Sequence, residues 1–137
     1  MIVETIKQLL EESAQVTAIV QDRIFPRFIP DAVAFPALVI TKATGIGSYD
    51  LQGDVGLEAA RIQVDCYALG AAEVIELRTV VRRLLSGFSG GAASGSPCAI
   101  ASCFCINDVD LSDPSTERAG PRLKRRMLEF NVWNREL

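Results

Sequence analysis

Residues 57–87, LEAARIQVDCYALGAAEVIELRTVVRRLLSG, join a predicted strand to a predicted helix. In the first half apolar and polar residues alternate, which is typical of a strand with one buried face. After Gly70 the apolar residues recur at helical spacing, and Gly87 supplies a stop signal. The residues expected to face the core are Ala60, Ile62, Val64, Cys66, Ala68, Val74, Leu77, Val81, Leu84 and Leu85.

Two helical segments and another strand are predicted before this stretch. Residues 2–10 place their apolar side chains on one helical face, and residues 14–25 predict a second, short helical turn. Three prolines then keep residues 23–35 extended. Residues 36–44 (PALVITKAT) read as a strand, and the Gly-rich residues 45–56 connect it to the next strand as a hairpin with a long arm.

Two more strands are predicted after the long helix. Residues 88–97 (FSGGAASGSP) predict a loop, and residues 98–108 (CAIASCFCIND) a strand that is apolar or small on both faces. Such a strand is expected to be central or covered on both sides, with Ile100, Phe104 and Ile106 sharing one face. Residues 108–121 predict a second polar arm before the last strand, residues 122–135.

The order of elements is α, short α, β, β, α, β, β. Strand pairs interrupted by one long helix predict an α+β domain with a single four-stranded, mostly antiparallel sheet. The helices are expected to pack on one face of that sheet, and long hairpin arms are expected to project from it. Residues 1–137 are long enough for one domain and short for two.

Charge and hydropathy exclude some classes of protein. Seventeen acidic against fourteen basic residues give a net charge of −3, which argues against a dedicated nucleic-acid binder with a basic face. The start of the chain lacks the pattern of an export signal. The longest apolar run, residues 32–40, is interrupted by Pro36 and is too short to span a bilayer, so no membrane association is expected.

Residue types also exclude most catalysis. The chain has no histidine, so Ser-His and Cys-His nucleophile pairs cannot form. Its four cysteines show no CxxC spacing and are interpreted as small buried apolar residues of a reducing compartment. Asp108, Asp110 and Asp113 fall at a strand-to-loop junction, where acids usually solvate a turn. Residues 45–56 match no phosphate-loop spacing. We therefore predict no enzyme activity and no catalytic, metal or cofactor site.

The last strand begins with RLKRR, residues 122–126, which hold four of the fourteen basic side chains. Arg122, Lys124 and Arg126 would share the face of the apolar Leu128, whereas Arg125 would lie on the opposite face. Three cations cannot share a buried face, so the strand must bulge or overhang the sheet before Met127, and we expect the overhang. Three interpretations remain open for this cluster: a charged edge that deters strand addition, contact with a neighbouring subunit, and contact with DNA that does not read sequence.

Two long arms and outward-facing aromatic side chains favour a protein that is fully covered only in an oligomer. The candidate interface residues are Arg122, Lys124, Arg125, Arg126, Asp108, Asp110, Asp113, Tyr49, Tyr67 and Trp133.

The chain also resembles a known family. Residues 16–40 (VTAIVQDRIFPRFIPDAVAFPALVI), residues 60–85 (ARIQVDCYALGAAEVIELRTVVRRLL) and residues 125–136 (RRMLEFNVWNRE) together resemble the tail terminator, or tail-completion, proteins of long-tailed bacteriophages and of phage-derived gene transfer particles. The resemblance implies a non-enzymatic virion protein, made in the bacterial cytoplasm, that closes the tail tube as a hexameric ring and joins the tail to the head connector.

The resemblance implies several partners: other copies of the chain, the tail tube protein, the head-tail connector, and DNA that passes through the lumen without sequence readout. In such a ring the basic cluster would face the tube, acids of the next subunit such as Asp108, Asp110 and Asp113, or the DNA path. We rank the two protein contacts above DNA because the body is acidic. The alternatives are another phage neck or tail-tube ring subunit, and a small nucleic-acid-binding module.

Overall fold

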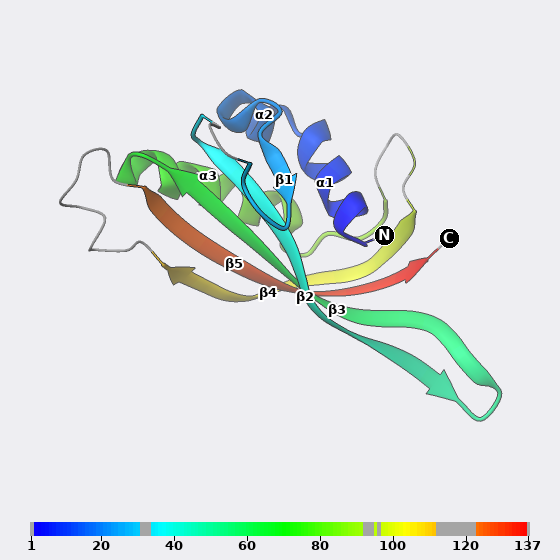
Figure 1. Cartoon of the computed structure of the whole chain (residues 1–137). Coiled ribbons are helices and arrows are strands. Elements are labelled where there is room, and N and C mark those ends of the chain that lie inside the picture. Colours follow the sequence, from blue (N-terminus) through cyan, green and yellow to red (C-terminus); the bar gives the residue numbers. More distant parts are fainter. Residues whose placement is uncertain (1, 31–33, 92–94, 96, 112–122, 137) are drawn as a thin grey trace.

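The chain folds into one sheet with its helices gathered on one side (Figure 1). This computed structural model describes residues 2–30, 34–91, 95, 97–111 and 123–136. The elements are α1 (Ile2–Glu12), α2 (Ala14–Val20), β1 (Ile24–Pro26), β2 (Ala37–Asp50), β3 (Gly53–Ala68), α3 (Ala71–Leu85), β4 (Cys98–Asp110) and β5 (Lys124–Glu136).

The strands are ordered β1-β2-β3-β5-β4 across the sheet, and only the β1–β2 pair is parallel. The α+β prediction is confirmed, with five strands instead of four. The additional strand, β1, has only three residues and ends at Pro26. It is too short to show an alternating pattern, and it lies in the segment that the prolines were expected to keep extended.

The core lies between the helices and the sheet, as the apolar periodicities predict. Val74, Leu77, Val81 and Leu85 of α3 are buried, and Leu84 is partly buried against them. They pack with the alternating residues of the two central strands and with the apolar faces of α1 and α2. The largest fully buried side chains include Phe130, Ile6, Leu10, Leu38, Ile40, Ile62, Leu77, Leu85 and Leu128.

The first predicted arm is confirmed. The last residue of β3 that pairs with β5 is Leu57, opposite Arg135, so residues 47–56 form a two-stranded ribbon beyond the rest of the sheet (Figure 1). We name residues 47–56 the arm. Its turn ends at Gly53, whose φ of +124° disfavours a residue with a side chain. The second predicted arm lies largely in residues 112–122, outside the described residues, as does part of the predicted loop 88–97.

The prediction for β4 is wrong in two respects. β4 is an edge strand, neither central nor covered on both sides. Its register shifts between Ile100 and Ser102, which exchanges the two faces of the strand, and shifts again between Cys105 and Asn107, which restores them. Ile100 and Cys103 are therefore both buried, whereas Phe104 and Ile106 are 55% and 46% exposed.

Among the described residues, no helix is long and apolar enough to cross a bilayer.

Candidate interface

The basic cluster lies at the start of β5, where the expected overhang does not occur. Arg126 is paired with Cys66 on one side and Asp110 on the other, and Lys124 is paired with Ala68. The prediction of an overhang was wrong because the structure neutralises the cations where they lie. Arg122 and Asp113 fall outside the described residues.

On the helix-covered face, Arg126 joins an ion-pair cluster centred on Asp108. Arg126 Nη2 lies 3.3 Å from Asp108 Oδ1, and Arg78 Nε of α3 donates to Asp108 Oδ2 at 2.7 Å. A second hydrogen bond joins Arg78 Nη2 to the same oxygen. Burial opposes ionisation of the Asp108 carboxyl, but hydrogen bonds from Arg78 and Arg126 outweigh it and lower its pKa. The bond to Asp108 in turn raises the pKa of Arg78. This carboxylate is therefore engaged within its own subunit.

On the other face of the sheet, Arg125 pairs with Asp65. Arg125 Nε donates to Asp65 Oδ1 at 3.0 Å, and the guanidinium lies 5.7 Å from the centre of the Tyr67 ring. Burial works against the charge of Arg125, but the hydrogen bond to Asp65 prevails and raises its pKa. Tyr67 also contacts Phe35, at 6.4 Å between ring centres. The prediction that Arg125 lies on this face is confirmed, and Tyr67 is half covered by its own chain.

The remaining candidates divide by exposure. Trp133 is half-buried, and it pairs with Ala59 of β3 on one side and with Ser102 of β4 on the other. Asp110 is exposed at the end of β4, and Tyr49 is 73% exposed on the arm. The structure thus does not bring the eight described candidates together into one patch. Several serve the subunit's own stability.

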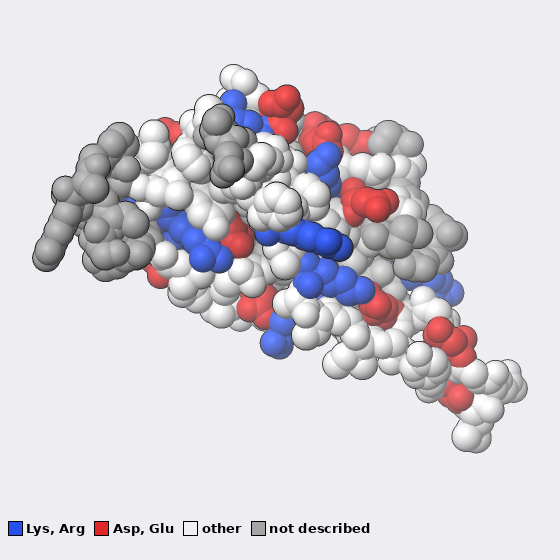
Figure 2. Space-filling view, in the orientation of Figure 1, with Lys and Arg blue, Asp and Glu red and all other residues white. Residues whose placement is uncertain are grey.

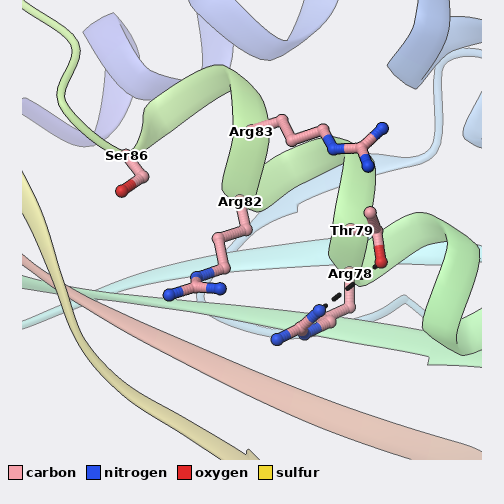
Figure 3. Close-up of a pocket in the computed structure, with 5 residues that line it drawn as sticks. All are labelled: Arg78, Thr79, Arg82, Arg83 and Ser86. Carbon is pink, nitrogen blue, oxygen red and sulfur yellow. Dashed lines mark hydrogen bonds between the residues drawn. The ribbon is translucent and has the colours of Figure 1, made fainter.

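A basic groove on α3 was not predicted. It has a volume of about 450 Å³ and is lined by Arg78, Thr79, Arg82, Arg83 and Ser86 (Figure 3). We name it the α3 groove. Arg78 and Arg82 are four residues apart and extend to the same side of the helix, whereas Arg83 extends in a different direction (Figure 3). The sequence pattern that could have indicated this groove is the four-residue spacing of Arg78 and Arg82, which places both on a helix face that the apolar residues leave free.

The α3 groove also has a structural explanation. Arg82 and Arg83 lie in the last turn of α3, where cations interact favourably with the helix dipole. That effect accounts for the charge at this end of the helix. The helix dipole does not explain why the guanidiniums of Arg82 and Arg83 are both exposed and, among the described residues, pair with no carboxylate.

Nothing in the described residues forms a reactive centre. Cys66, Cys98 and Cys103 are buried, and burial raises the pKa of Cys103 to about 12, so it is a thiol at neutral pH. No group of three potential metal ligands occurs in the described part of the chain.

Two exposed surfaces could serve assembly. One is the outer edge of β4, where, in the described part of the chain, a bridge from Gly90 to Ile100 and a hydrogen bond from Gly87 to Cys103 cover the first half of the strand. The other is the arm with its base, where Ile46, Tyr49 and Leu51 are exposed. Figure 2 shows the arm at the lower right, with acidic and uncharged atoms toward its end. An exposed strand edge beside apolar side chains is a ready site for another chain.

Comparisons with known proteins agree with the fold and with the absence of reactive groups. The structure is similar to a chain from the "Virion of native gene transfer agent (GTA) particle", with a TM-score of 0.70 and 16% sequence identity over 96% of this chain and 92% of that chain. At that identity the likeness shows the fold alone. Comparison with curated proteins gives no significant match.

The family model described as "Tail completion protein gp17" matches residues 4–135, nearly the whole chain. This match confirms the resemblance found in the sequence. It also confirms that the chain is a structural protein and not an enzyme. The chain belongs to the tail completion protein gp17 family.

Proposed function

We propose that this protein closes the end of the tail tube as a hexameric ring and joins the tail to the head connector. The observation that carries the proposal is the arm, a paired ribbon that extends past β5 and exposes Tyr49 and Leu51. Covering such a surface requires another chain. In a ring of identical copies, each arm would reach the next subunit.

In a ring of identical subunits, each copy contacts the next in a head-to-tail arrangement. Two different surfaces of the chain must therefore recognise each other. The chain has several unlike surfaces, among them the arm, the outer edge of β4 and the α3 groove. The exposed Phe104 and Ile106 beside that edge supply apolar area for contact with another subunit or with the tube.

The partners in this proposal are other copies, the tail tube protein and the head connector, at the tail or neck of the virion. DNA would pass through the lumen without sequence readout. Protein contacts are favoured over tight DNA binding because the chain carries a net charge of −3. A nucleic-acid-binding module is the alternative, and the arginines of the α3 groove are its only specific support.

The test uses particles that lack this protein, complemented with the wild-type chain or with an arm-shortened variant. The variant replaces residues 48–57, beyond the Gly47–Glu58 pair, with a two-residue Asn-Gly turn. We expect wild-type protein to restore tails of uniform length joined to heads in electron micrographs. The variant should fold, because its core is untouched, yet yield unjoined tails.

A control variant changes the exposed Phe28 to Ser, well away from the arm, and should complement. Joined, uniform tails from the arm-shortened variant would rule out the role of the arm. A separate assay measures binding of the purified protein to duplex DNA at several salt concentrations. Strong, salt-sensitive affinity together with failure to restore tails would favour the nucleic-acid module.

A further inference from the structure

We infer that the acidic tip of the arm of one subunit binds in the α3 groove of the neighbouring subunit. This inference rests on the proposed ring and names the contact that would close it. The occupant of the groove is a second copy of the chain, and the argument is the complementarity of charge between two surfaces that the fold holds apart.

The arm supplies the negative partner. Asp50 and Asp54 are the only charged residues in residues 47–56, and both are exposed. Each uses Oδ1 to accept a backbone N–H at 2.7 Å, from Gln52 and Gly56 respectively. These bonds hold the two carboxylates in place at the turn, and among the described residues neither forms an ion pair.

The α3 groove supplies the positive partner. Arg78 is already paired with Asp108, so its position is fixed. Arg82 is exposed, extends to the same side, and pairs with no carboxylate in the described residues (Figure 3). The hydroxyl group of Ser86 lies at the same groove and can donate to a carboxylate, whereas the Thr79 hydroxyl donates to the carbonyl oxygen of Ile75 at 2.8 Å. Asp50 pairs with Gly53 and Asp54 pairs with Tyr49, so the two carboxylates lie on opposite faces of the arm. A groove volume of about 450 Å³ has room for one of these acidic side chains with the adjoining residues of the turn.

Apolar contact would accompany the ion pairs. The arm exposes Tyr49 and Leu51 beside Asp50, and α3 exposes Ile75 one turn before Thr79. Burying apolar area contributes about 25 cal/mol per Å², so the apolar side chains would add affinity that salt does not screen. A tip that carries two acids among apolar residues fits a basic groove with an apolar neighbour.

The contact must join different subunits. The paired ribbon that ends with Asp50 opposite Gly53 extends beyond β5, away from α3 of its own chain (Figure 1). Because the arm and the α3 groove are unlike surfaces, the contact is head-to-tail and repeats from copy to copy. DNA is the competing occupant of the α3 groove. The apolar surface beside the arginines, however, makes no favourable contact with a phosphate backbone.

A charge-swap experiment tests the inference with the full chain and purified tail tubes. One variant carries Arg82→Asp and Arg83→Asp, another carries Asp50→Arg and Asp54→Arg, and a third combines all four changes. The control, Lys7→Asp, removes a half-buried cation on α1 whose ion pair in the described residues is with Glu11. Thermal unfolding checks the fold of each variant, and sedimentation measures the fraction of protein that forms rings on tubes.

We expect each two-residue variant to weaken ring formation at least about tenfold, the range expected for lost pairs of close charges. The combined variant should recover most of that loss, and the control should match the wild type. If the combined variant recovers ring formation, the loss in the two-residue variants cannot be explained by misfolding or by lost DNA binding.

Four results would overturn the inference. Wild-type rings with no effect of either variant would refute the contact and leave the proposed function standing. Loss in both variants without rescue would assign the residues to other partners. An Arg82/Arg83 variant that loses affinity for duplex DNA but still forms rings would assign the α3 groove to DNA. Wild-type protein that forms no ring on tubes would refute the proposed function and the inference together.

Discussion

Replacing Asp108 by Asn should destabilise the folded chain, because it removes the only carboxylate observed between Arg78 and Arg126 in the described structure. The Asp108 side chain is 20% exposed and receives hydrogen bonds from both guanidiniums. A hydrogen bond to a charged group contributes about 1.5–3 kcal/mol, and an exposed ion pair contributes less than about 1 kcal/mol. The partly buried cluster lies between these cases. Asn keeps the shape of the side chain and one weaker acceptor, so we expect a loss of about 2 kcal/mol.

Thermal and urea unfolding at pH 7 measure this loss. For a domain of this size, about 2 kcal/mol corresponds to a fall of about 6–10 °C in the unfolding midpoint. Asp22→Asn is the matched control, because Asp22 is exposed after α2 and should change stability by less than about 0.5 kcal/mol.

The pH dependence gives an independent check. The folded-state pKa of Asp108 is lowered, so its contribution is fully present above the unfolded pKa of about 3.9 and is lost as pH falls through the folded value. Wild type and Asp108→Asn should therefore differ at pH 7 and converge in strong acid. Equal stability of the two proteins at pH 7 would refute the role of the cluster.

Three further predictions concern the fold. Phe130→Ala removes a fully buried ring and should cost about 3–5 kcal/mol in urea unfolding; a loss below about 1 kcal/mol would contradict the assigned core. Gly53→Ala places a side chain at a positive φ in the turn of the arm and should cost about 1 kcal/mol or more, whereas an unchanged midpoint would contradict this turn conformation. Burial raises the pKa values of Cys66 and Cys103, so neither should react with a thiol reagent at pH 8 until the protein is unfolded. Rapid labelling of either one in the native protein would show that the core is open.

Much of the fold could be predicted because local patterns decide it. The alternation in β3 and the helical spacing in α3 each identify one buried face, and the Gly-rich residues 45–56 identify the arm. β1 could not be predicted, since three residues carry no period. Two register shifts, after Ile100 and after Cys105, reverse the faces of β4 between them, and an alternating pattern cannot reveal them.

The candidate interface was harder to predict because its ion pairs join residues that are far apart in the sequence. The partner of Arg126 lies 18 residues away, and the partner of Arg125 lies 60 residues away. From the sequence alone these cations had no visible counter-charge, so an overhang was expected. The α3 groove was missed for the opposite reason. Its arginines occupy an ordinary solvent-facing helix surface, and only the fold shows that they line a cavity.

The stoichiometry of the protein on tail tubes tests the central claim most directly. Mass measurement of the purified chain alone, and of tube ends saturated with it, counts the copies bound. We predict one hexameric ring at the tube end that blocks further addition of tube protein. A single copy per tube end, or tubes that keep growing in its presence, would contradict the account.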